Sequence, residues 1–151
     1  MARGQTAELP GRGVYVVQVV LDAPLDIAVG SLGRLVFPRG SYLYVGSAQS
    51  NLPARVARHA RPEKPLRWHI DHLTTSGRVP LAWAWEKPAE YECRIAGCLG
   101  QRFPVVAGFG ASDCARPGHL FRAAAGPALR WITECLESPC ARVRVVQPWN
   151  W

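Results

Sequence analysis

The sequence predicts an α+β fold, in which helices flank a small, mainly antiparallel sheet and an additional helix and strand follow at the C-terminal end. Two observations lead to this prediction. Valine- and tyrosine-rich segments of strand length fill residues 13–48, and the connections between them are too short for parallel crossovers. After Gly46 the apolar residues recur mainly with helical spacing.

Length and composition indicate one globular domain. The chain has 151 residues, of which 48% are hydrophobic and 19% are charged, which is enough for a real core. No repeat or linker divides it, so we expect a flexible tail over residues 1–10 and a single domain over residues 11–151. The apolar runs are too short to span a bilayer, and the N-terminus lacks the apolar core of a secretory leader. A cytoplasmic protein is therefore expected.

The first half of the domain is expected to form strands. Residues 13–22 are rich in valine and end before Pro24, and residues 41–48 alternate tyrosines and small residues with Leu43 and Val45. Residues 26–30 and 33–40 are shorter strand candidates between them. These four segments indicate an antiparallel meander or hairpin sheet.

Helices and strands mix in the second half. Asn51 is the expected N-cap of a first helix, with Pro53 in its first turn and Pro62 beyond its end. Further helices are expected over residues 65–73, 88–103 and 126–138. Further strands are expected over residues 79–87 and 141–149, and a short one is expected at the end of the glycine-rich segment 108–123.

The five cysteines are expected to be reduced. No C-x-x-C pair occurs, and the spacing of Cys93 and Cys98 on an expected helix suits neither a disulfide between them nor a zinc site. Cytosolic proteins keep their thiols reduced. The alternative is a disulfide between Cys135 and Cys140 around the end of a helix.

The charge suggests a polyanionic partner. Lysine and arginine total 18 against 11 acidic residues, and arginine, whose planar guanidinium suits phosphate, supplies most of the positive charge. Nucleic acid is the first partner to consider. An arginine-rich composition with solvated surface charge explains the same balance equally well.

Two tyrosines and a basic helix are the first candidates for a site. Tyr15 and Tyr44 lie beside glycines in expected strands, where a ligand or backbone can approach closely, although strand tyrosines are more often core residues. Arg55 and His59 are four residues apart and share one helical face, so Arg55 could neutralise a phosphate oxygen and His59 could exchange a proton near neutral pH.

Further cations and one carboxylate extend this candidate site. We expect the following residues to contact nucleic acid: Ser47, Arg58, Arg61, Lys64, Arg67 and His69. The alternative for the basic run is a solvated helical face. Glu92 could hold Mg²⁺ together with several waters, although Glu86 and Glu90 are close in sequence and a lone helical glutamate is usually a surface residue. His69 and His72 are three residues apart, so they do not match the metalloprotease pattern.

The ordered set Gly13-Val14-Tyr15, Tyr44-Val45-Gly46, Arg55, His59 and Glu92 resembles the motifs of the GIY-YIG nuclease superfamily. Nearly the whole chain is similar to the Uri-type endonuclease subgroup, through the stretches "FPRGSYLYVGSA", "ARVARHAR", "WHIDHL", "YEC", "GFGASDC" and "HLF". The resemblance implies a small antiparallel sheet flanked by helices and hydrolysis of DNA with one divalent ion, Mg²⁺ or Mn²⁺.

The resemblance also implies a role for each motif residue. Tyr15 and Tyr44 would line the site, one of them would help position or deprotonate the attacking water, and His59 would assist in activating it. Arg55 would stabilise the pentavalent phosphorus, and Glu92 would hold the metal.

Three functions are therefore weighed. The leading one is a metal-dependent DNA endonuclease, acting in DNA repair. The second is an inactive module of the same fold that binds DNA or RNA. The third is an adaptor that docks to a repair enzyme through exposed tryptophans such as Trp149 and Trp151.

Overall fold

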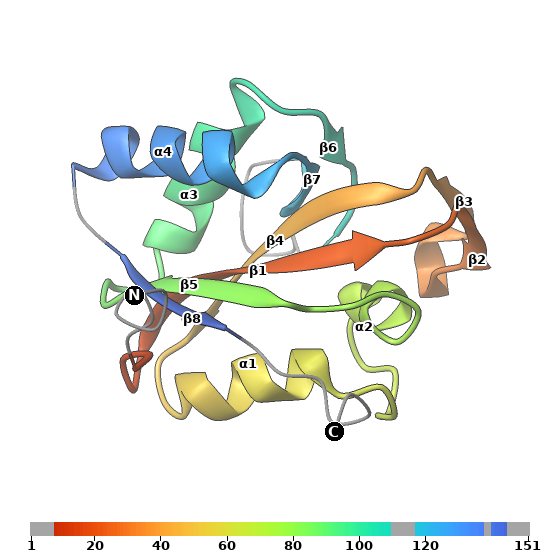
Figure 1. The fold of residues 1–151 in the computed structure, drawn as a ribbon, viewed down its shortest axis with the longest axis horizontal. Helices are drawn as coiled ribbons and strands as arrows, with labels where there is room; N and C mark the ends of the chain where they lie inside the picture. The colour runs from red at the N-terminus through yellow and green to blue at the C-terminus, as the bar shows by residue number, and fades with distance from the viewer. Residues whose placement is uncertain (1–7, 110–116, 138–139, 145–151) are drawn as a thin grey trace.

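The computed structural model describes residues 8–109, 117–137 and 140–144, and these have the α+β class that the sequence predicts (Figure 1). The strands are β1 (Gly13–Leu21), β2 (Leu25–Ala28), β3 (Arg34–Phe37), β4 (Gly40–Ala48), β5 (Leu81–Trp85), β6 (Val105–Val106), β7 (Leu120–Arg122) and β8 (Ala141–Arg144). The helices are α1 (Leu52–Ala60), α2 (His69–Thr74), α3 (Tyr91–Gly100) and α4 (Ala125–Leu136), with a short 3-10 helix η2 (Gly30–Leu32).

The main sheet has six strands in the order β6-β7-β4-β1-β5-β8, and every neighbouring pair is antiparallel. Strands β1 and β4 form its centre, with Tyr15 opposite Gly46 in the register. Strands β2 and β3 form a separate hairpin beyond one end of β1 and β4 (Figure 1). The antiparallel arrangement follows from the short connections between the first strands.

The alternation of side chains along the strands divides the core into two clusters. Tyr15 and Val17 of β1 pack with residues of α1 and α2, whereas Val14 and Val16 pack with residues of α3 and α4. Figure 1 shows these two helix pairs on opposite faces of the sheet. Trp83 and Trp85 of β5 both belong to the α3 and α4 cluster, because residues two apart on a strand share one face.

Several expected boundaries shift. Asn51 does precede α1, but its φ of 54° is left-handed and its side chain makes no capping hydrogen bond. Helix α2 begins at His69 and not at residue 65, because the intervening residues form an extended approach to the N-cap residue Trp68. Strand β6 was not expected, since it has only two residues and exists only by pairing with β7.

Some expectations fall outside the described residues. These are most of the expected N-terminal tail, the glycine-rich segment 110–116, and the C-terminal residues that include Trp149 and Trp151. None of the helices in the described ranges is long and apolar enough to cross a membrane.

The expectation of reduced cysteines is wrong, since Cys93, Cys98 and Cys135 are all disulfide-bonded. A disulfide joins Cys98 of α3 to Cys135 of α4, with the Cα atoms 6.6 Å apart. It also excludes the alternative bridge between Cys135 and Cys140. The bridge forms because α3 and α4 pack side by side on one face of the sheet, a contact between residues 37 positions apart that spacing alone does not reveal.

Candidate active site

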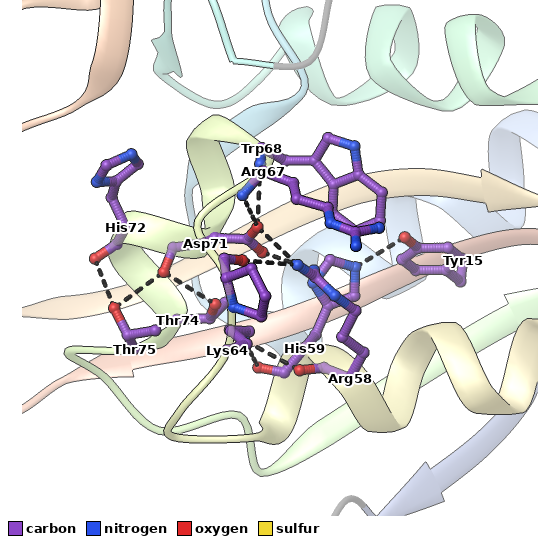
Figure 2. Close-up of polar contacts among 11 residues, drawn as sticks. Tyr15, Arg58, His59, Lys64, Arg67, Trp68, Asp71, His72, Thr74 and Thr75 are labelled. Carbon is purple, nitrogen blue, oxygen red and sulfur yellow. Dashed lines mark hydrogen bonds and ion pairs between the residues drawn. The ribbon is translucent and has the colours of Figure 1, made fainter.

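A buried hydrogen bond joins β1 to α1. The hydroxyl of Tyr15 lies 2.8 Å from Nε2 of His59, and both side chains are almost completely buried (Figure 2). Burial raises the pKa of the Tyr15 phenol and lowers the pKa of the His59 imidazole to about 3. At neutral pH both side chains are therefore uncharged, and the hydrogen bond joins a neutral phenol to a neutral imidazole. The expectation that His59 exchanges a proton near neutral pH by its own titration is wrong, because burial disfavours the imidazolium.

Tyr44 and Gly46 of β4 surround this pair. The Tyr44 ring meets the His59 ring edge-on, with centroids 5.8 Å apart. A Cβ atom at Gly46 would lie 2.5 Å from the Tyr15 hydroxyl. The glycine is needed here because a larger residue would displace the phenol from His59.

Arg55 brings a positive charge to the two tyrosines. Burial is the largest effect on the pKa of both phenols and raises it, and the Arg55 charge acts in the opposite direction on both. The guanidinium donates to the backbone carbonyl of Ser47 at 3.2 Å. Ser47, expected to contact nucleic acid, thus takes part in the site through its backbone. Arg55 is only half-buried, so its charge is accessible from solvent.

Trp68 lies against the same helix. The guanidinium carbons of Arg55 and Arg58 are 5.0 Å and 4.4 Å from the centre of its ring, within the range of cation–π contacts. The His59 ring is 6.1 Å away, centroid to centroid. Trp68 is nevertheless one of the few large apolar side chains that remain exposed, at 37%. An exposed indole beside the Tyr15 and His59 pair is a feature that sequence analysis did not single out.

Glu92 reaches this region from the opposite helix layer. It lies in the first turn of α3, and its negative charge adds to burial in raising the pKa of both Tyr15 and Tyr44. The electrostatics therefore connect Glu92 with the two tyrosines, as the motif order predicts. Carboxylate Oε2 lies 2.7 Å from Nδ1 of His119, a buried histidine directly before β7. His119 was missed as a site residue, and its signal in the sequence was the stretch "HLF".

Two of the expected phosphate contacts have other partners. Arg58 makes two hydrogen bonds to the buried carboxylate of Asp71, of 2.9 and 3.0 Å, and a third to the carbonyl of Pro65 (Figure 2). Lys64 donates to the carbonyls of Arg58 and His59 at the end of α1, and burial lowers its pKa to about 8. Both cations stabilise the α1–α2 connection.

The remaining expected contacts divide in the same way. Arg61 and Arg67 are exposed and can meet a phosphate backbone. His69 is half-buried, and its ring lies near the carbonyl of Gly108 at 3.3 Å and the ring of Phe109. It attaches α2 to the segment that ends at Phe109.

The carboxylate chemistry fits a water-rich cation site. The described residues contain no group of three or more histidine, cysteine, aspartate or glutamate side chains arranged to hold a metal ion. Glu92, with its side chain 24% exposed, is a carboxylate whose charge acts on both tyrosines. One or two protein ligands completed by water and substrate oxygens is the usual arrangement for Mg²⁺ at phosphate-processing sites.

Comparison with known proteins gives one match. The family described as "Domain of unknown function DUF123" matches residues 14–139, most of the chain. No curated protein and no solved structure matches.

Proposed function

This chain belongs to the family described as Domain of unknown function DUF123, and we propose that it is a GIY-YIG-type nuclease of the Uri subgroup. Its activity in this proposal is divalent-metal-dependent hydrolysis of phosphodiester bonds in DNA, in the cytoplasm and in the service of DNA repair. The observation that carries the proposal is the buried Tyr15 and His59 pair, with Arg55 and Glu92 both acting on its electrostatics.

The Tyr15 and His59 pair suits the orientation of a water molecule. The phenol oxygen of Tyr15 is held by its hydrogen bond with Nε2 of His59 and keeps a lone pair that can accept a hydrogen bond from an attacking water. His59 stays neutral and fixes the position of the phenol, so Tyr15 can orient the attacking water. Burial of both side chains holds the oxygen in one place, and Tyr44 and Gly46 keep it there.

Arg55 and Glu92 supply the two charges that phosphodiester hydrolysis needs. Arg55, held by the Ser47 carbonyl, can stabilise the negative charge that develops on the phosphate oxygens. Glu92 would hold the divalent ion, which when bound polarises the phosphate and stabilises the leaving oxygen. Arg61 and Arg67 are placed to contact neighbouring phosphates, and Trp68 can stack on a base.

Cleavage of supercoiled, nicked and branched DNA with Mg²⁺ or Mn²⁺ tests the proposal. We expect Arg55→Ala and Glu92→Gln each to reduce the rate about 100-fold or more, as loss of a charge-stabilising group does elsewhere. Matched controls are Arg130→Ala, an exposed arginine on α4, and Glu90→Gln, an exposed glutamate directly before α3. Both controls should cleave at the wild-type rate.

Two outcomes would contradict the proposal. Cleavage that is unchanged in Arg55→Ala and Glu92→Gln would come from a contaminant. Salt-dependent DNA binding without cleavage in any metal would identify an inactive binding module of the same fold. The proposed cytoplasmic location is tested separately, by counting the free thiols of the protein isolated from its native cells. A reducing compartment disfavours the Cys98–Cys135 disulfide, so free Cys98 and Cys135 thiols would support that location.

A further inference from the structure

His119 is held rigidly at the edge of the candidate active site. Its backbone N–H donates to the carbonyl of Phe109 at 2.8 Å, and its carbonyl accepts from the N–H of Val45 at 2.9 Å. The preceding Gly118 lies so close to the carbonyl of Val106 that a Cβ atom would come within 2.6 Å of it. The main chain therefore fixes where the imidazole lies.

The imidazole of His119 is buried but unsatisfied. Its side chain is only 2% exposed, and neither ring nitrogen makes a hydrogen bond within the described residues. Leaving a buried polar nitrogen without a partner costs roughly 1–3 kcal/mol. Such a cost at a rigid position next to a proposed site points to a group that satisfies the nitrogen when it binds.

His119 and the Glu92 carboxylate lie within ion-pair distance but do not form a hydrogen bond. Nδ1 lies 2.7 Å from Oε2, whereas Nε2 has no hydrogen-bond partner at all within the described residues. Two polar atoms that converge in this way can both face a third atom between them. Glu92 retains some exposure to solvent, so the approach to that position is open.

We propose that His119 is a second protein ligand, beside Glu92, for the divalent metal ion of this site, and that the site consequently prefers transition-metal ions to Mg²⁺. The inference rests on the proposed function only for the presence of a metal at Glu92. A hard ion such as Mg²⁺ takes oxygen ligands, whereas an imidazole suits later first-row metals, whose affinity for mixed nitrogen and oxygen sites rises from Mn²⁺ towards Ni²⁺. A site of Glu92 alone would show a smaller preference, because it offers no nitrogen ligand.

Metal binding without DNA tests this directly. The tag-free full-length chain is titrated with Mn²⁺ and the free ion is followed by electron paramagnetic resonance, with Mg²⁺ and Co²⁺ as competitors. Pulsed measurements on bound Mn²⁺ detect a directly coordinated ¹⁴N nucleus. We expect that nitrogen signal in the wild type, and displacement of Mn²⁺ by Co²⁺ at concentrations at least about tenfold lower than by Mg²⁺.

Variants assign the signal to His119. His119→Ala should remove the nitrogen signal, weaken Mn²⁺ binding about tenfold to hundredfold, and reduce the preference for Co²⁺ over Mg²⁺. The matched control His72→Ala should change none of these, because His72 is half-buried on α2 and its ring lies apart from Tyr15 and His59 (Figure 2). Because His119 is buried, circular dichroism is used to check that the His119→Ala protein is folded. The nitrogen signal of the wild type tests the proposal even if that variant does not fold.

Three results would overturn the proposal: no nitrogen signal on bound Mn²⁺ in the wild type, the same signal in a folded His119→Ala protein, or no Mn²⁺ binding at all. A nitrogen signal that is absent while Glu92→Gln still abolishes Mn²⁺ binding would leave His119 as a residue that only positions Glu92. Because no DNA is present, these results are independent of cleavage, so the nuclease proposal and this inference can fail separately.

Discussion

Arg58→Ala should destabilise the protein strongly and leave its contacts with DNA phosphates unchanged. The carboxylate of Asp71 is 0% exposed, and Arg58 forms two of its hydrogen bonds, at 2.9 and 3.0 Å. Removing one partner of a buried ion pair costs about 3–5 kcal/mol, because the other charge stays buried and unpaired. Asp71 keeps the backbone N–H groups of Arg67 and Trp68 as donors, so we expect the lower end of that range, about 3 kcal/mol.

The assay is denaturation in urea, with the free energy of unfolding extrapolated to water. Arg61→Ala is the matched control, since Arg61 is an exposed arginine directly after α1, and its unfolding free energy should change by no more than about 0.5 kcal/mol. DNA binding, measured at several salt concentrations, should instead be affected by Arg61→Ala and not by Arg58→Ala. Arg61→Ala should lower the salt slope by about one, and folded Arg58→Ala should not.

The effect of pH gives a second check on the same pair. Burial by itself would raise the pKa of Asp71, but the hydrogen bonds from Arg58 and from the backbone outweigh it, and the pKa is lowered from 3.8. The stabilisation is thus fully present above pH 3.8 and is lost as the pH falls through the lower pKa of the folded state. The difference between wild type and Arg58→Ala should therefore shrink in strong acid. An Arg58→Ala protein as stable as Arg61→Ala, with a reduced salt slope, would refute this reasoning and make Arg58 a phosphate contact.

The remaining predictions concern the site itself. The folded pKa of His59 is about 3 and its ordinary value is 6.5, so stability should fall as the pH drops from 6.5 to 3, by up to about 1.4 kcal/mol per pH unit. His59→Gln should remove this slope, which denaturation at pH 7, 5 and 4 would show, and an unchanged slope would contradict burial as its cause. Gly46→Ala should push the Tyr15 phenol away from His59, lower the free energy of unfolding by about 1–3 kcal/mol and abolish cleavage. A fully active variant would show that cleavage does not depend on the Tyr15 and His59 pair. Trp68→Ala should weaken binding of single-stranded or branched DNA by about 1–3 kcal/mol in titrations, whereas Trp68→Phe should bind almost as tightly as wild type. Equal losses of affinity in the two variants would rule out stacking on a base.

Local patterns predicted much of the fold. The alternation of Tyr42 and Tyr44 with Leu43 and Val45 predicted which side chains share a sheet face, and the two core clusters confirm it. The short connections among the first strands predicted their antiparallel pairing. These features depend on neighbours in the chain, so the sequence carries them directly.

Features that depend on distant neighbours were missed. The disulfide between Cys98 and Cys135 requires α3 and α4 to lie side by side, and strand β6 requires β7 as a partner. The intramolecular partners of Arg58 and Lys64 have the same origin, because Asp71 and the carbonyls at the end of α1 are positioned by how the chain turns towards α2. Charge alone did not separate them from Arg61 and Arg67, which remain exposed.

The sequence by itself determined the order of the motif residues, from Tyr15 and Tyr44 through Arg55 and His59 to Glu92, and the strands and helices that carry them. Only the tertiary structure decided their chemical states. A histidine in the sequence is a group that titrates near neutral pH, but burial beside Tyr15 keeps His59 neutral, and the strands around β7 bring His119 to Glu92. The physical reason is that desolvation and charge interactions depend on distances through space, and these are set by packing between segments far apart along the chain.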